Sequence, residues 1–289
     1  MKNWGKIFFW VVILALLVGT GYYFRADLFG WFRFAKTEVE VRVEQLKKIE
    51  QKIITPSPLR GPIEEVASNL TIKGTVEQTN IQRTQNGLAS LLVNAQLIAM
   101  AQAKVDDMFV KQYFAHESPI GEGPNDLAKS AGYEYIVVGE NLALGNFKDD
   151  AALVDAWMNS PGHRENILNS KYTEIGIALK RGVYEGYTTW LAVQEFGRPV
   201  SDCPLPSEAL NTQIEENQTL LLELEKQLEN KSSELRSIRP KRGNVYNQKV
   251  EEYNEMVNQY NAFLEDTKTL ISDYNNRVKL YNACIDEGT

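Results

Sequence analysis

Hydrophobic and polar positions follow three different patterns along the chain, and each pattern predicts a different kind of structure. The first is an uncharged run near the N-terminus, the second alternates helical stripes with β-rich runs, and the third repeats apolar positions every three or four residues. Helical stripes beside β-rich runs predict the α+β fold class. The changes of pattern divide the chain into residues 1–24, 25–76, 77–200 and 201–289.

Residues 7–24, IFFWVVILALLVGTGYYF, contain no charged side chain. These 18 residues would span about 27 Å as an α-helix, close to the hydrocarbon thickness of a bilayer. A cleaved signal peptide would end in a small-residue cleavage site, whereas aromatic residues follow this run. Residues 1–24 are therefore predicted to be a cytoplasmic tip and an uncleaved transmembrane helix. The alternative is a buried core helix.

The flanking charges predict the orientation of this anchor. Lys2 and Lys6 favour a cytoplasmic N-terminus, although Arg25 and Arg33 partly oppose it. With the N-terminus inside, the bulk of the chain is extracytoplasmic, and the cell membrane is a partner through residues 7–24. The formal net charge of −7 argues against nucleic acid as a partner, because proteins that bind nucleic acid present basic surfaces to its phosphates.

Residues 25–76 are predicted to hold a juxtamembrane helix and a linker. Residues 36–54, KTEVEVRVEQLKKIEQKII, are predicted to be a short helix leaving the membrane. Residues 55–62, TPSPLRGP, contain three prolines and a glycine, which is typical of a linker. The run LTIKG at residues 70–74 is predicted to be a short strand.

Residues 77–200 are predicted to form layers of helices around a small antiparallel sheet, an α-β-α sandwich. One helix ends at Asn86-Gly87, and the next begins after Asn94 with the Lys104 stem at the edge of its apolar stripe. Further helices are predicted at residues 125–132 and 149–160. The β-rich runs are YEYIVVGENLALG, with a break at Gly-Glu-Asn, then EIGIALKRG and TTWLAVQEFG, which pair as a hairpin.

Residues 201–289 carry apolar residues at heptad a and d spacing, interrupted by RPKRGN at residues 239–244. Two long helices joined by a tight turn predict an antiparallel coiled-coil hairpin. In the second helix the tyrosines are each followed by asparagine. They are Tyr246, Tyr253, Tyr260, Tyr274 and Tyr281. A stripe at this spacing favours the hairpin core over the alternative of a carbohydrate-contacting surface.

The two cysteines fit the same hairpin. Folding the chain near residue 242 brings Cys203 close to Cys284, and an extracytoplasmic compartment is oxidising. A disulfide there would clamp the open end of the hairpin and stabilise it by about 4–5 kcal/mol in the chain-entropy model. The alternative is two free buried thiols. The absence of any Cys-x-x-Cys pair excludes a zinc ribbon.

Seven sequence blocks occur together in the layered segment. They are TNIQR, NAQL, YFAHESP, GENLA, AWMNSPGHRENIL, YTEIGIA and VQEFG. In this order they resemble the CAP superfamily of cysteine-rich secretory proteins, antigen 5 allergens and pathogenesis-related proteins, and in particular its bacterial SCP-like branch. The N-terminal anchor and the helical hairpin lie outside the resemblance.

The resemblance implies an α-β-α sandwich with a cleft that holds two histidines and two glutamates. Carried over residue by residue, His116, Glu140 and His163 match three of the four positions. The fourth position, three residues after Trp157, is Ser160, which removes the second glutamate of the animal and plant pattern. Some members of the family bind a divalent metal there, so Zn²⁺ or another divalent ion is the implied cofactor.

Two histidines and a carboxylate are the ligand count of a catalytic zinc site, and a carboxylate beside histidine suits a general base. We therefore expect His116 and His163 to face each other across one cleft, in loops and partly solvated, with Glu140 bound to one of them. Ile167 and Leu168 are expected to bury beneath it. The alternative gives each residue a local role: His163 bonds the backbone of the Ser-Pro-Gly turn, and Glu140 caps the segment that starts at Asn141.

Two classes of function fit these residues. The first is a membrane-anchored extracytoplasmic binding or scaffold protein that takes an envelope ligand or protein partner. The second is a divalent-metal-dependent hydrolase, peptidase-like, that uses His116, Glu140 and His163. A third and less favoured class is lipid or sterol binding, which the resemblance also implies. The chain has no nucleophile elbow and no His-Glu-x-x-His motif, so the first class is favoured over an enzyme.

Overall fold

The computed structural model describes residues 43–64 and 67–288, so the predicted anchor at residues 7–24 lies outside the described residues. Within those ranges no helix combines the length and hydrophobicity needed to cross a bilayer. The chain divides into two compact units. The first consists of Met1–Gln45 and Pro206–Val278, and the second of Leu46–Leu205 and Lys279–Thr289.

The second unit is built on a six-stranded mixed sheet, counted over the residues described. The strands are β1 (Lys52–Ile54), β2 (Leu59–Arg60), β3 (Leu92–Val93), β4 (Tyr135–Gly145), β5 (Glu174–Tyr184) and β6 (Tyr187–Pro199). Their order is β1-β4-β6-β5-β3, with β2 also paired to β4. The long strands β4, β6 and β5 run antiparallel, whereas β1, β2 and β3 pair in parallel.

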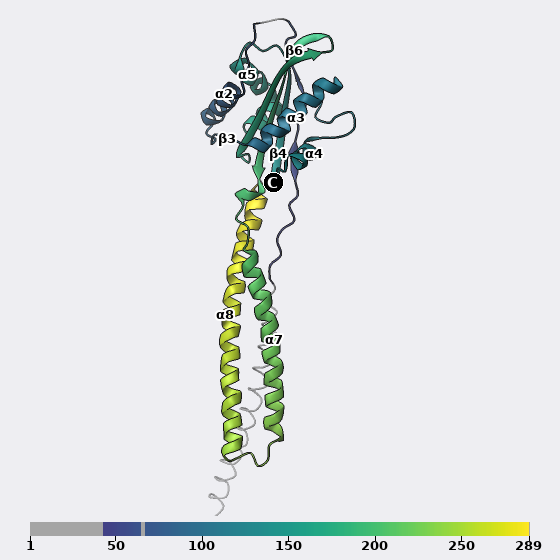
Figure 1. Ribbon diagram of the computed structural model, residues 1–289. Helices are drawn as coiled ribbons and strands as arrows, with labels where there is room; N and C mark the ends of the chain where they lie inside the picture. The colour runs from purple at the N-terminus through teal and green to yellow at the C-terminus, as the bar shows by residue number, and fades with distance from the viewer. Residues whose placement is uncertain (1–42, 65–66, 289) are drawn as a thin grey trace, which may run out of the picture. The chain divides into compact units, whose positions relative to one another are not determined.

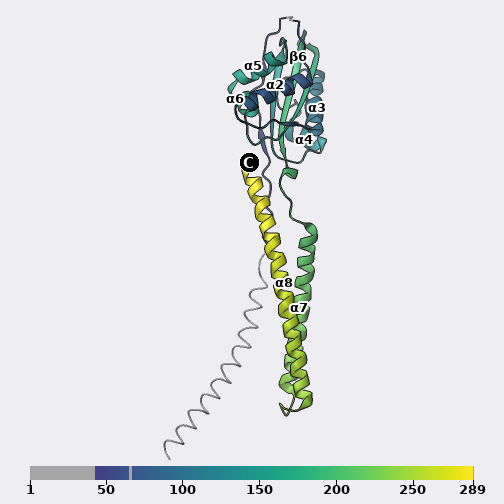
Figure 2. The ribbon, with the colours of Figure 1, turned by 90° about the vertical axis from the view of Figure 1, so that its left-hand side faces the viewer.

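Helices cover both faces of this sheet, as Figure 1 shows from the side and Figure 2 from the face of α2, α5 and α6. These three are α2 (Ile72–Gln85), α5 (Asp150–Asn159) and α6 (Pro161–Ile167). The opposite face carries α3 (Ala95–Lys111) and α4 (Pro124–Ala131). The predicted α-β-α sandwich is therefore confirmed for this unit.

Apolar side chains on each face of the sheet are buried against the helices that cover that face. Val105 and Met108 of α3 pack in one core with Leu142 of β4, and Trp157 and Ile167 pack in the other, with Ala143 among their neighbours. Because successive side chains of β4 point to opposite cores, every residue of the strand is buried.

Local signals placed several elements correctly. Asn86 ends α2, and Asn94 begins α3 by accepting hydrogen bonds from the N–H groups of Gln96 and Leu97 at 2.7 and 3.2 Å. The β5–β6 hairpin turns over Glu185 and Gly186, whose φ angles of 49° and 88° suit a tight two-residue connection.

Three predictions of local structure are wrong. Residues 70–74 are not a strand, because Thr71 caps α2 through a hydrogen bond from the Gly74 N–H. β4 is not broken at Gly-Glu-Asn, because these residues pair fully with β6. The described part of residues 36–54 contains no helix and ends in strand β1. The predicted linker likewise contains strand β2. Both segments form strands because the edge of β4 offers them main-chain hydrogen-bond partners.

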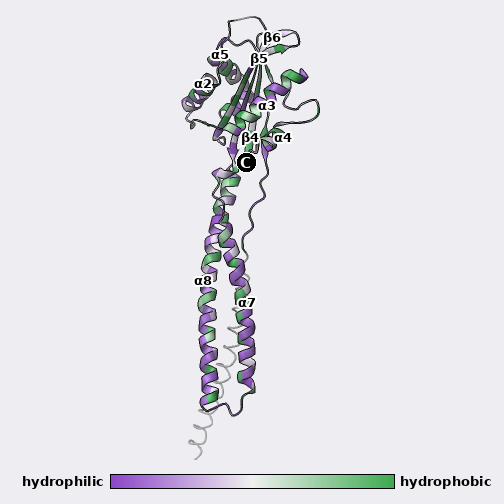
Figure 3. Cartoon of the chain, viewed as in Figure 1, coloured by the Kyte–Doolittle hydropathy of each residue, from purple (hydrophilic) through white to green (hydrophobic). Residues whose placement is uncertain are grey.

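Two long helices, α7 (Glu208–Ser237) and α8 (Asn244–Gly288), fill the C-terminal segment, and the short helix η1 (Val200–Asp202) precedes them. In the first unit, heptad positions of the two helices share apolar clusters, in which Leu221 and Leu228 meet Tyr260 and Leu264. Figure 3 shows these helices as largely hydrophilic with apolar positions at intervals. Burial of Tyr260 supports the prediction that the tyrosine stripe belongs to a core.

The predicted disulfide is confirmed: Cys203 and Cys284 are joined within the second unit. Cys203 is buried in a small cluster with Ile136, Tyr281 and Ile285. The C-terminal end of α8 is therefore tied covalently to the residues that follow β6.

Candidate functional site

The register of β4 and β6 places polar side chains in two opposed pairs. Glu140 lies opposite Glu195, and Asn141 lies opposite Gln194. Because neighbouring pairs point to opposite faces of the sheet, the two glutamates lie on the α3 face and the two amides on the face of α2 and α6. Gln194 accordingly donates to Thr79 of α2 at 2.8 Å, and all four side chains are fully buried.

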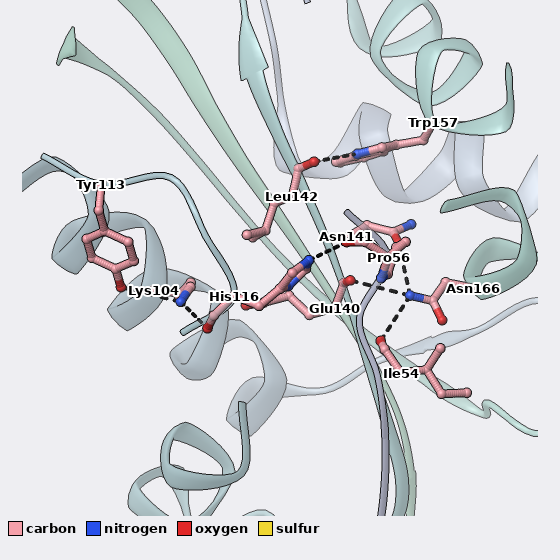
Figure 4. A network of polar contacts seen from close by, with 10 residues as sticks. All are labelled: Ile54, Pro56, Lys104, Tyr113, His116, Glu140, Asn141, Leu142, Trp157 and Asn166. Atoms are coloured by element: carbon pink, nitrogen blue, oxygen red, sulfur yellow. Dashed lines mark hydrogen bonds and ion pairs between the residues drawn. The ribbon is translucent and has the colours of Figure 1, made fainter. Parts of the chain in front are cut away.

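His116 lies in the loop after α3 and contacts the first of these glutamates. Its Nδ1 is 2.6 Å from Oε1 of Glu140, and its Nε2 contacts the carbonyl oxygen of Pro56 (Figure 4). Both partners offer oxygen atoms that accept hydrogen bonds, so the arrangement suits donation from the ring through Nε2–H. The Nε2–H group is thereby aimed at a main-chain carbonyl.

Glu195 supplies a second buried carboxyl group that the sequence analysis did not assign. Complete burial raises the pKa of Glu195 well above its ordinary value, the neighbouring Glu140 raises it further, and Lys104 partly offsets both. A neutral Glu195 can donate a hydrogen bond to Glu140, which gives the otherwise unpaired buried oxygens a partner. Glu195 and Glu140 therefore form a buried carboxyl pair in which the pKa of Glu195 is raised.

Lys104 holds the His116 loop in place. Its Nζ donates to the carbonyl oxygen of His116 and to the hydroxyl of Tyr113, the latter at 3.3 Å. Burial lowers the pKa of Lys104, while the charges of Glu140 and Glu195 oppose that shift. The prediction that Lys104 lies at the edge of its helical stripe is wrong, because the residue is only 1% exposed.

His163 occupies a different environment from His116. It is the third residue of α6 rather than a loop residue, it is 1% exposed, and its Nδ1 is 2.8 Å from the Ser160 hydroxyl. Ser160 begins α6 without a side-chain cap because its hydroxyl serves His163 instead. The expectation of a partly solvated His163 in a loop is therefore wrong, and its Nδ1 contact is to the side chain of Ser160 rather than to the backbone of the turn.

The environment of His163 keeps its ring neutral. Burial lowers the pKa of His163 to about 4, and the charge of nearby His116 contributes to the same shift. Its Nε2 is buried and has no hydrogen-bond partner among residues 43–64 and 67–288. Within α6, Ile167 is fully buried as expected, whereas Leu168, which follows the helix, is only half-buried.

Of the three predicted ligands, the structure joins His116 to Glu140 by a direct hydrogen bond, and it joins His163 to Ser160. Within the part of the chain that the structure describes, no group of three or more His, Cys, Asp or Glu side chains is arranged to hold a metal ion. The geometry suits hydrogen-bond donation to a carbonyl group better than coordination of Zn²⁺.

Residues that were not predicted from the sequence also belong to the site. Asn166 of α6 donates to the carbonyl oxygen of Ile54 at 3.2 Å and to Oδ1 of Asn141 at 3.0 Å. Glu195 had one visible signal, a carboxyl group within the apolar run LAVQEFG that reads as a buried strand. Pro56 had none, because it lies in a segment whose composition predicts a linker.

Residues 76–196 match the family described as CAP: Cysteine-rich secretory protein family. The matched segment is less than half of the chain and lies within the second unit, which is therefore similar to the CAP family. The remaining residues on either side lie outside the match.

Two curated proteins of Bacillus subtilis (strain 168) are similar to this domain. Uncharacterized protein YkwD is 44% identical over 118 residues, which are 41% of this chain and 44% of that protein. Uncharacterized membrane protein YlbC is 34% identical over 112 residues, which are 39% of this chain and 32% of that protein. The chain thus spans less than half the length of either relative.

Among solved structures, the chain is similar to an extracellular protein containing a SCP domain from Bacillus anthracis str. Ames. It is 31% identical to this chain, covers 44% of it over 40% of its own length, and has a TM-score of 0.38.

Proposed function

We propose that this chain is an extracytoplasmic binding module, anchored to the membrane through residues 7–24, whose CAP domain takes an envelope ligand at the outer edge of β4. The observation that carries the proposal is the Nε2–H group of His116, which Glu140 supports from behind and which serves a main-chain carbonyl. A charge-assisted donor of this kind is a recognition group, and it needs no metal ion to act.

An extracytoplasmic location is supported by the Cys203–Cys284 disulfide, because such bonds persist in oxidising compartments. The name of the relative YlbC, a membrane protein, is consistent with the proposed anchor. We further propose that α7 and α8 form an antiparallel coiled-coil hairpin that spaces the CAP domain or contacts a partner, since their shared clusters lie at heptad positions.

The metal-dependent hydrolase remains the competing function for the same residues. It requires a third ligand beside His116 and Glu140, and within the described residues no group of three or more His, Cys, Asp or Glu side chains is arranged to hold a metal ion. A binding role uses the observed contacts as they stand, so it is the better supported of the two.

Binding is tested by sedimenting the full chain, held in lipid nanodiscs, with purified bacterial cell envelopes. We expect saturable co-sedimentation that weakens at least about tenfold in His116→Ala, because the charge-assisted hydrogen bond is lost. Glu117→Gln is the matched control, since this neighbour is exposed and should bind like the wild type. Equal binding by His116→Ala, or protein hydrolysis that a chelator abolishes, would refute the binding role.

A further inference from the structure

Residues 52–60, the edge segment, lie along the outer edge of β4 in two parallel pieces. Ile54 of β1 is in register with Gly139, and Leu59 of β2 is in register with Ala143. Between these two pairings the edge segment has one residue more than β4 has, so it arches away from the strand. The arch falls opposite residues 140–142, where Glu140 and its partner His116 lie.

The arch is held by side chains from outside the sheet. His116 contacts the carbonyl oxygen of Pro56, and Asn166 donates to the carbonyl oxygen of Ile54, two residues earlier. The two donors, one from the loop after α3 and one from α6, therefore hold carbonyl groups two residues apart in the edge segment. Figure 4 shows both donors converging on these residues.

Gly162, at the start of α6, also lies against the edge segment. A Cβ atom built on Gly162 would lie 2.7 Å from Cβ of Pro56, so the helix can approach the segment only with glycine there. Close approach to a proline ring is the physical requirement.

The edge segment has the character of a ligand rather than of a core strand. Each of its residues is exposed or only half-buried, and its main chain pairs with β4 in two places, while Ile54 and Leu59 pack against the core. Such main-chain pairing is the mode by which proteins add an extended peptide to a sheet edge. The segment also precedes residues 76–196, the span that matches the CAP family.

The two prolines suit the arch. Pro56 and Pro58 lie where the segment leaves β4, and a proline has no N–H group that would be left without a partner there. Each proline also favours the extended conformation of the residue before it. The carbonyl of Pro56 remains available, and it is the group that His116 contacts.

We infer that the outer edge of β4 is a binding site for an extended polypeptide with a Pro-x-Pro sequence, and that the edge segment occupies this site in cis. The inference rests on the proposed binding function and names its ligand class. A covalently linked occupant competes at an effective concentration of roughly millimolar. A polypeptide from outside therefore binds only when it displaces residues 52–60.

The test uses a fluorescein-labelled peptide with the sequence of residues 51–63, QKIITPSPLRGPI, and the full chain in nanodiscs. Fluorescence anisotropy should show weak binding to the wild type and binding about tenfold tighter to the double variant Pro56→Gly, Pro58→Gly, whose own segment is more flexible when released. Adding Asn166→Ala to that variant should weaken the peptide again. Pro204→Gly, an exposed proline outside the segment, is the matched control and should behave like the wild type.

Absence of peptide binding to the loosened variant, with its fold retained by circular dichroism, would overturn the inference. If His116→Ala still weakens envelope binding in that case, the proposed function survives and only the ligand class is wrong. If neither assay depends on His116, both proposals fail.

Hydrogen exchange provides a second measurement that does not need the proline variants. In Gly162→Ala, the added Cβ should crowd Pro56, and the amides of residues 52–60 should exchange at least about tenfold faster while those of β6 stay unchanged. Exchange of the segment only together with β6 would show that it opens only with the whole fold, which contradicts a displaceable occupant.

Discussion

Replacing Arg83 with methionine is expected to lower the free energy of unfolding of the second unit by about 4 kcal/mol. Arg83 is 2% exposed and ties α2 to residues that follow it in the chain, both near and far. Its guanidinium donates to the carbonyl oxygens of Ala89 at 2.9 Å, Ile167 at 2.8 Å, Asn169 at 2.8 Å and Tyr172 at 3.4 Å. Methionine fills a similar volume but leaves these carbonyl groups without their donor.

Urea unfolding followed by tryptophan fluorescence measures this loss. Arg83→Lys should fall between the wild type and Arg83→Met, because an ammonium group cannot reach all four carbonyl groups. Arg181→Met, at an exposed position of β5, is the control and should change stability by less than about 0.5 kcal/mol. A loss below about 1 kcal/mol for Arg83→Met would show that solvent replaces the guanidinium, contrary to its burial.

The second large effect is a loss of stability in acid that depends on His163. In the unfolded chain this ring takes up a proton near its ordinary pKa of about 6.5, whereas in the folded protein its pKa is lowered to about 4. Between these values the unfolded state binds more protons, so stability falls as the pH falls through this window. The contribution amounts to about 3 kcal/mol when the pH has fallen to about 4.

The comparison is between the wild type and His163→Asn, whose amide can still contact Ser160 but does not titrate. Stability measured at a series of pH values should fall more steeply for the wild type between about pH 6.5 and 4. Parallel curves would mean that His163 is solvated in the folded state.

Local rules predicted the layered domain well because its signals are short-range. Asn94 caps its helix by accepting hydrogen bonds from the N–H groups two and three residues later. Gly186 adopts the positive φ angle that the tight turn needs and that few other residues tolerate. The two cysteines could be paired because the heptad pattern fixed the length of each helix between them. Each of these inferences needs only the neighbouring residues or a constant period.

The site was predicted in part, and the missing part is long-range. The His116–Glu140 contact could be expected from the blocks YFAHESP and GENLA, and the structure shows it. The role of Glu195 depends on the register between β4 and β6, which no local pattern states. The role of Pro56 depends on a loop-like segment finding the edge of a strand far along the chain, where tertiary hydrogen bonds override its composition.

His163 shows how an assigned role can fail on geometry. His163 was expected to lie in a loop, partly solvated, and to face His116 across a cleft. The proline instead begins α6, so that the ring lies on the buried side of a short helix, and the glycine is required for its small size. Burial of that ring was not readable from the sequence, because it depends on how α6 packs against β4.

The central claim is that the His116 ring serves a polypeptide carbonyl through Nε2–H and is not a metal ligand. The chain has two histidines, so nitrogen NMR of the full chain labelled at histidine contains only their ring signals. We predict that titration with Zn²⁺ leaves both sets of signals in place. If the signals of His116 and His163 shift together at one equivalent of zinc, and Glu140→Gln abolishes the shift, the three residues form a metal site and the account is contradicted.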